Sequence, residues 1–226
     1  MVFFSSTQEL KDGLFLDQDE IILAKGGKRE SVVNVHDLKL LGKHNYENVM
    51  AAVAMSLKMN VPLDTIRKVI KEFKAVEHRI EFVLERCGVK YYNDSIASSP
   101  TRTIAGLRSF RQKVILIAGG KDKNIDYAPL GPEIVQHVRF LILTGGDVIG
   151  STVPKICAAV LNAPEYDSVA LPILLIDDFE EAVRAAAAQA SEGDVVLLSP
   201  ASTSFDKFSN FMERGKTFKA VVNHLE

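Results

Sequence analysis

The chain has 226 residues, of which 47% are hydrophobic and 25% charged, and its 27 basic and 29 acidic side chains give a net charge of −2. This balance is typical of a globular protein and argues against a binder of nucleic acid or membrane surfaces. Two distant cysteines, Cys87 and Cys157, fit a reducing compartment, and the five histidines lack the spacing of a zinc site. With no long apolar run and no basic leader, we expect a cytoplasmic protein.

The first third of the chain combines short strands with two helices. Three apolar runs cover residues 13–16, 20–24 and 31–35, and a hairpin turn is expected at Gly26–Gly27. Three strands are too few to close a sheet of their own. We therefore expect this part of the chain to be a portion of a larger domain. Helices are expected from near His44 and after Pro62. The helical pattern then stops, and we place a domain boundary between residues 1–77 and 78–226.

The remaining two thirds alternate wholly apolar strands with helices. The expected strands are 114–118, 138–144, 173–176 and 195–199, and the expected helices are 100–110, 129–137, 150–162 and 178–191. A final helix is expected to carry an apolar side formed by Phe205, Phe208, Met212, Phe218 and Val222. Strands that are apolar on both faces belong in a parallel sheet covered on each side. The predicted fold class is therefore α/β, with a Rossmann-like, mostly parallel sheet.

Three strand ends run into polar or glycine-rich loops, where open parallel sheets bind ligands. The first loop contains Asn93–Ser99, and Ser99 with Pro100 predicts a helix start at which Ser98 and free N–H groups favour an anion. Asp94 is a candidate for a ribose hydroxyl or for a supporting contact. An ordinary capped helix without a ligand explains the same residues.

The second loop, Gly119–Asn124, has two glycines followed by two lysines and suits a phosphate or a carboxylate, although a surface lysine pair explains it equally well. The third loop, Ser199–Asp206, offers four hydroxyls, or simply another capped helix. No GxGxxG dinucleotide motif is present. Gly215–Thr217 ends like a P-loop but lies within a helical pattern and lacks the upstream glycine.

Segments spread over the whole chain resemble the Mur ligase family, and within it the members that add D-glutamate. They occur in the family's order: Gly42–Asn48, Glu77–Arg79, Asn93–Ser95, Gly119–Lys123, Ser199–Asp206 and Glu213–Phe218. The resemblance implies that 1–77 is the C-terminal portion of the central ATP-binding domain and 78–226 the amino-acid-binding domain. It also implies that the P-loop, the Mg²⁺ ligands and the UDP-binding domain lie upstream of Met1.

The family's reaction uses ATP to phosphorylate the carboxylate of UDP-N-acetylmuramoyl-L-alanine, and D-glutamate then attacks the acyl phosphate, in peptidoglycan synthesis. The resemblance implies roles for eight residues. Asn45 and Asn48 would contact adenine, and Arg79 and Asp94 would contact other parts of the nucleotide. D-glutamate would be held by Lys123, Ser98, Ser204 and Phe211. No catalytic residue is assigned. Ile96 stands where the family commonly has lysine, which makes Lys123 the main cation for the acceptor and Arg102 the reserve. We expect these residues alone to be monomeric and inactive.

Other functions are compatible with parts of the sequence. Sibling Mur ligases that add diaminopimelate carry an Asp-Asn-Pro-Arg motif that is absent here, and we find no folylpolyglutamate ligase motif. A non-catalytic module that binds a nucleotide or amino acid remains an alternative. A Rossmann oxidoreductase is disfavoured by the missing glycine fingerprint.

Overall fold

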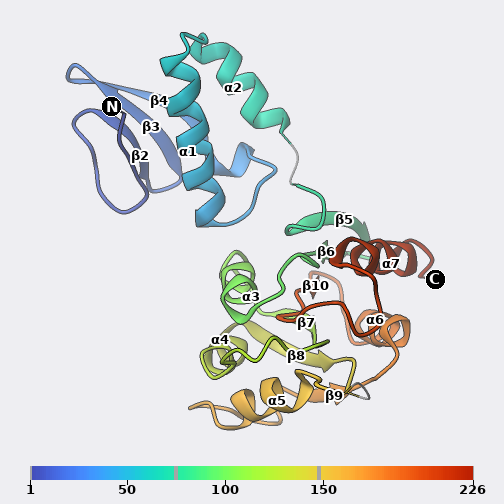
Figure 1. Cartoon of the computed structure of the whole chain (residues 1–226). Helices are drawn as coiled ribbons and strands as arrows, with labels where there is room; N and C mark the ends of the chain where they lie inside the picture. The colour runs from blue at the N-terminus through green and yellow to red at the C-terminus, as the bar shows by residue number, and fades with distance from the viewer. Residues whose placement is uncertain (1, 74–75, 147–148, 226) are drawn as a thin grey trace. The chain divides into compact units, whose positions relative to one another are not determined.

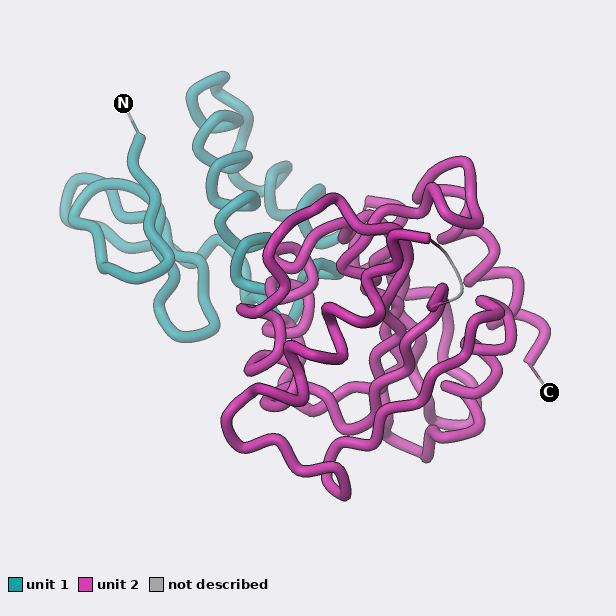
Figure 2. Tube along the Cα trace, turned by 60° about the horizontal axis from the view of Figure 1, so that its bottom comes forward, with its two compact units in different colours: residues 1–75 teal, residues 76–226 magenta. Residues whose placement is uncertain are grey.

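The computed structural model describes residues 2–73, 76–146 and 149–225. The chain forms two compact units, Met1–Ala75 and Val76–Glu226, which Figure 2 distinguishes by colour. Within the described ranges, none of the helices has the length and apolar character that crossing a membrane requires.

Unit 1 is a small sheet packed against two helices. Its elements are β1 (Phe4–Ser5), β2 (Gly13–Asp17), β3 (Glu20–Lys25), β4 (Lys28–Asn34), the 3-10 helix η1 (Val35–Asp37), α1 (Lys43–Lys58) and α2 (Leu63–Glu72). Among the described residues the sheet order is β1-β2-β3-β4, with β1 parallel to β2 and the other pairs antiparallel. Gly26 and Gly27 connect β3 to β4, as predicted, with φ of 58° and 77°.

Three of these strands were expected from the sequence, and β1 was not. The very short β1 has no strand pattern of its own, yet it adds a fourth strand through its pairing with β2. The helices then complete the core, because Leu14 and Ile21 of the sheet pack with Met50 and Val53 of α1 and Ile66 of α2.

Unit 2 contains a larger, mostly parallel sheet (Figure 1). Its strands are β5 (Glu81–Arg86), β6 (Val89–Asn93), β7 (Val114–Ala118), β8 (Val138–Leu143), β9 (Ile173–Leu175) and β10 (Val195–Leu198). Its helices are α3 (Pro100–Leu107), α4 (Leu130–His137), α5 (Val153–Leu161), α6 (Phe179–Ala188) and α7 (Phe211–Asn223). In the described residues the strand order is β5-β6-β10-β7-β8-β9, and only β5 runs antiparallel to its neighbour.

Helices cover both faces of this sheet, which confirms the predicted fold class. Along β7, Val114, Leu116 and Ala118 belong to the core formed with α3, α4 and α5, whereas Ile115 and Ile117 face α6 and α7. Successive side chains of a strand point to opposite faces, so a wholly apolar strand needs two covering layers.

Helix α7 starts at Phe211, so the prediction that Phe205 and Phe208 lie on this helix was wrong. Asn210 caps the helix, with its Oδ1 accepting a hydrogen bond from the N–H of Glu213 at 2.9 Å. The residues before this cap form a loop, in which the hydroxyl groups of Ser202 and Thr203 donate to the carbonyls of Gly119 and Lys121. The helix-like spacing of the phenylalanines is therefore coincidental.

Candidate functional site

Three loops follow β6, β7 and β10, which are neighbours in the sheet and parallel to one another. The loops cover residues 94–99, 119–129 and 199–210. Because the carboxyl ends of parallel strands meet at one edge, these loops lie together at the edge where such sheets bind ligands. We call this set of residues the three-loop edge.

Lys123 and Ser98 meet at the three-loop edge although they come from different loops. The Nζ atom of Lys123 donates a hydrogen bond to Oγ of Ser98 at 3.2 Å, and the lysine side chain is exposed. Ser99 precedes α3 and Pro100 is its first residue, as predicted, although the Ser99 hydroxyl makes no capping hydrogen bond. The pair thus presents an ammonium and a hydroxyl to solvent next to a helix start.

The two other residues predicted for D-glutamate are placed differently. Ser204 is buried, and within the described residues its side chain makes no hydrogen bond to Lys123 or Ser98. Phe211, at the start of α7, lies edge-on to the ring of His78 with 6.0 Å between the centroids. Its carbonyl accepts a hydrogen bond from Oγ of Ser95 at 2.8 Å, which ties it to the first loop.

Asp94 is the first residue of the first loop, and its side chain is buried. Its Oδ1 accepts from the N–H of Ile80 at 3.2 Å, and its Oδ2 accepts from the hydroxyl of Ser199 at 2.8 Å. Burial raises the pKa of Asp94 to about 7, although these hydrogen bonds and the charges of Arg79 and Arg102 act in the opposite direction. The carboxyl group therefore gains or loses its proton near neutral pH.

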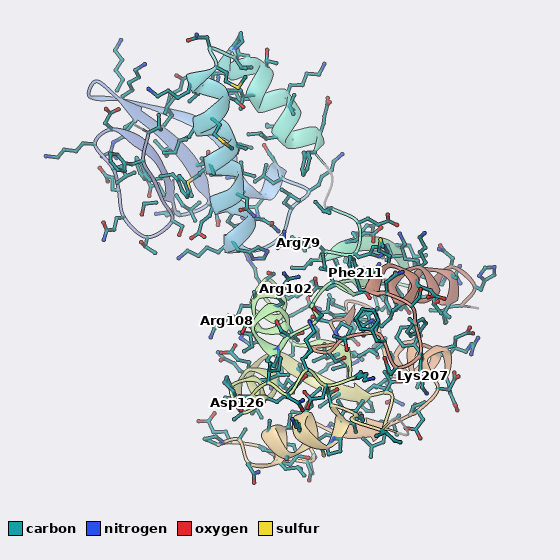
Figure 3. All side chains as sticks on the ribbon, viewed as in Figure 1. Arg79, Arg102, Arg108, Asp126, Lys207 and Phe211 are labelled. Carbon is teal, nitrogen blue, oxygen red and sulfur yellow. The ribbon has the colours of Figure 1, made fainter. Side chains whose placement is uncertain are left out.

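Two arginines lie on the segments that flank Asp94. Arg79 is exposed just before β5, and Arg102 lies in the first turn of α3, where its Nη1 donates to the carbonyl of Ile96 at 3.3 Å. Figure 3 labels Arg79 before β5, Arg102 on α3 and Phe211 at the start of α7. The side chains of Arg79 and Arg102 add positive charge beside the first loop.

The two asparagines predicted to contact adenine lie one turn apart on α1 of unit 1. Asn45 is buried and its Nδ2 donates to the carbonyl of Leu41 at 2.6 Å, which fixes the chain before the helix. Asn48 is exposed. Its amide is therefore the more accessible of the two to a ligand.

The glycines of the second loop permit a close approach between loops. A Cβ on Gly119 would lie 2.2 Å from the carbonyl oxygen of Thr144, and one on Gly120 would lie 2.6 Å from both Oγ of Ser202 and the carbonyl oxygen of Thr203. Both glycines have positive φ, 117° and 135°. Glycine is thus needed here for packing as well as for turning the chain.

Arg214 was not predicted to have a role, yet it joins the first and third loops. Its buried guanidinium donates to the carbonyls of Ser95 at 2.9 Å, Ser202 at 3.1 Å and Thr203 at 3.1 Å, and to the hydroxyl of Ser95 at 3.0 Å. Burial lowers its pKa to about 10, and the charge of Asp206 opposes this. The sequence did contain a signal, since Arg214 shares the apolar side of α7 with Phe218.

Glu77, His78 and Glu81 bring together possible metal ligands that no sequence motif indicates. The ammonium of Lys219 already bonds to both carboxylates, at 2.6 Å from Glu77 and 3.0 Å from Glu81. His78 is buried, and its ring nitrogen lies 2.9 Å from the amide of Asn93. This cluster therefore stabilises the start of unit 2, and we assign no ion to it.

The covered, mostly parallel sheet defines unit 2 as a Rossmann-like α/β domain. A protein-family profile described as "Mur ligase, glutamate ligase domain" matches residues 78–202, more than half of the chain. The chain therefore belongs to the Mur ligase family.

Curated relatives match along the whole chain. It is 49% identical to a UDP-N-acetylmuramoylalanine–D-glutamate ligase of Acetivibrio thermocellus, over 100% of this chain and 48% of the relative. It is 46% identical to the ligase of the same name from Clostridium novyi, over 98% of this chain and 46% of the relative. The chain spans about half the length of the curated relatives it matches.

Solved structures of the family share the fold. A UDP-N-acetylmuramate-alanine ligase from Thermotoga maritima matches with a TM-score of 0.66 at 16% identity, covering 98% of this chain and 48% of that one. A UDP-N-acetylmuramoyl-L-alanyl-D-glutamate–2,6-diaminopimelate ligase matches with a TM-score of 0.60 at 17% identity, covering 97% and 47%. At these identities the likeness concerns the fold alone.

Proposed function

We propose that this chain supplies the D-glutamate site and part of the ATP site of a ligase that joins D-glutamate to UDP-N-acetylmuramoyl-L-alanine in peptidoglycan synthesis. The observation that carries the proposal is the contact between Lys123 and Ser98 at the three-loop edge. It supports the proposal because an ammonium and a hydroxyl at a helix start suit an anionic amino acid. The names of the relatives favour the same substrate.

In the proposed reaction, the γ-phosphoryl group of ATP moves to the alanyl carboxylate. The amine of D-glutamate then attacks the acyl carbon, forms the amide, loses a proton and expels phosphate. Lys123 would hold a carboxylate of D-glutamate, and the Ser98 hydroxyl would form a hydrogen bond to the same amino acid. Together these contacts would orient the amine of D-glutamate. Ser204 and Phe211 would complete the amino-acid site, although Ser204 must become accessible to do so.

For the nucleotide, we propose that Asn48 and Asn45 contact the adenine base. Arg79 and Asp94 would contact other parts of the nucleotide. An amide such as that of Asn48 offers both a donor and an acceptor to the edge of adenine. Asp94 would accept from a hydroxyl group, although its buried carboxyl group must become accessible to do so. Mg²⁺, when bound, would neutralise the phosphates. We assign none of the residues described here to Mg²⁺.

We propose that the protein works in the cytoplasm and that its oligomeric state is monomeric. Cys87 is exposed and neither cysteine forms a disulfide, which fits a reducing environment. Size-exclusion chromatography with light scattering measures the oligomeric state directly.

The function is tested by fusing the first half of the Acetivibrio thermocellus relative to this chain and measuring phosphate release from ATP. We expect release only with UDP-N-acetylmuramoyl-L-alanine and D-glutamate together, and none from the 226-residue chain alone. L-glutamate, L-alanine and diaminopimelate serve as competing acceptors. A preference for any of them would assign the chain to a different ligase, and binding without turnover in the fusion would favour the non-catalytic module.

A further inference from the structure

Asp122 precedes the exposed Lys123, yet its own carboxylate is enclosed, with 7% of the side chain exposed. Its Oδ1 accepts a hydrogen bond from the N–H of Asn124 at 2.9 Å, and its Oδ2 accepts one from Nζ of Lys155 on α5. A carboxylate that bonds to the residue two positions onward forms a local turn. The residue between them, Lys123, is held at the tip of this turn.

The same loop is attached to its surroundings by backbone bonds. The N–H of Asp122 donates to the carbonyl of Gly150 at 2.9 Å, and Lys121 pairs with both Ser151 and Thr203. Asn124 adopts a positive φ of 57°, a conformation that asparagine tolerates better than most residues. The path of the chain around Lys123 therefore depends on a small number of specific contacts.

Lys155 also compensates the charge beside Lys123. Burial by itself would raise the pKa of Asp122, but hydrogen bonds from Lys155 and from the N–H groups of Asn124 and Ile125 outweigh it and lower the pKa. The carboxylate is therefore ionised at neutral pH. Because Lys155 neutralises it, the ammonium of Lys123 can act on a ligand carboxylate instead of on its own neighbour.

We propose that Asp122 and Lys155 are positioning residues: their ion pair fixes the turn that directs Lys123 toward Ser98 and leaves the Lys123 charge to the acceptor amino acid. The inference rests on the proposed function in one respect, the identity of D-glutamate as that amino acid. Neither side chain is assigned a contact with the substrate, so both act through Lys123.

The kinetic test compares variants of the fused enzyme. We expect Asp122→Ala and Lys155→Met to raise the KM for D-glutamate by roughly 5- to 10-fold, with kcat and the KM for ATP nearly unchanged, because a displaced cation weakens binding of the acceptor. Lys155→Arg should restore most of the affinity, since it keeps the ion pair. In a Lys123→Met background, Lys155→Met should add almost nothing.

A structural measurement separates this inference from the proposed function. In the 226-residue chain, Asp122→Ala and Lys155→Met should accelerate amide hydrogen exchange of Asn124, observed by NMR. Arg184→Met, which breaks an exposed ion pair with Glu180 on α6, should change neither this exchange nor the KM.

Unchanged exchange at Asn124 would overturn the positioning role whatever the kinetics show. Faster exchange with no effect of Lys123→Met on the KM would instead overturn the proposed D-glutamate contact. A KM increase from Lys155→Met that persists in full without Lys123 would show that Lys155 acts by another route, which also contradicts the inference.

Discussion

Arg214 and Ser95 are joined by two hydrogen bonds, at 3.0 and 2.9 Å, although 119 positions separate them in the chain. The guanidinium also bonds to two carbonyls of the third loop. A single buried side chain thus sets the distance between two of the loops that we propose to bind substrate.

Replacing Arg214 by methionine should therefore destabilise the chain. The substitution removes the donor of the buried carbonyls of Ser95 and Ser202, whereas the carbonyl of Thr203 keeps the N–H of Lys121. We expect a cost of about 3 kcal/mol in the free energy of unfolding. Urea unfolding of the chain measures it. The matched control, Arg184→Met at an exposed ion pair, should change stability by less than about 0.5 kcal/mol. Equal effects of the two variants would show that Arg214 does not join the loops.

The second prediction concerns the two cations proposed for the acceptor. A charge-assisted hydrogen bond contributes about 1.5–3 kcal/mol, so Lys123→Ala should raise the KM for D-glutamate by roughly 10-fold or more. The KM for ATP should change little. Arg102 is the comparison, because its guanidinium already bonds to the carbonyl of Ile96. If Arg102→Ala raised this KM while Lys123→Ala did not, the acceptor pocket would lie on the other side of α3.

The third prediction tests the close approach of the loops at Gly120. Alanine at position 120 would have an unfavourable φ, and its Cβ would overlap with atoms of Ser202 and Thr203. Gly193 is the control, because it also has a positive φ but no atom lies within 4 Å of an added Cβ. The strain common to both variants is about 1–2 kcal/mol, and overlap adds roughly 1–3 kcal/mol at Gly120 alone. Thermal unfolding should therefore show a larger decrease in Tm for Gly120→Ala. Similar decreases would mean that the loops can separate at little cost.

Much of the unit 2 fold follows from the sequence. Strand β7 has the bounds 114–118 that its apolar run predicts, because a strand covered on both faces must be apolar throughout. The edge strand β5 was missed, since one of its faces is partly exposed and it mixes charged with apolar residues. The insertion of β10 between β6 and β7 was also not predictable, because periodicity reports which residues are buried and not which strands are neighbours.

The candidate site was predictable only in outline. Strand-end loops could be located, and family resemblance named Lys123 and Ser98, which the structure brings into contact. The support beneath them depends on contacts between distant segments. Asp122 reads as one more charged surface residue until its carboxylate is seen to face Lys155 on α5.

The last prediction follows from the pKa of Asp94, which burial raises from an ordinary 3.8 to about 7. Between these values the folded chain keeps a proton that the unfolded chain has lost. The contribution of Asp94 to stability therefore falls as the pH rises from about 4 to about 7, and it is constant above that range. Asparagine at this position cannot ionise and avoids this loss.

Asp94→Asn should consequently gain stability relative to the parent chain as the pH increases. Each pH unit within the window corresponds to about 1.4 kcal/mol. The free energy of unfolding of Asp94→Asn, relative to that of the parent chain, should therefore increase by roughly 2–3 kcal/mol between pH 5 and pH 8. Urea unfolding at both pH values measures this difference, in which the titration of other groups cancels. Asp126→Asn controls for the same substitution at an exposed position. A difference that stays constant, or that shrinks as the pH rises, would show that Asp94 is already ionised at pH 5 in the folded chain.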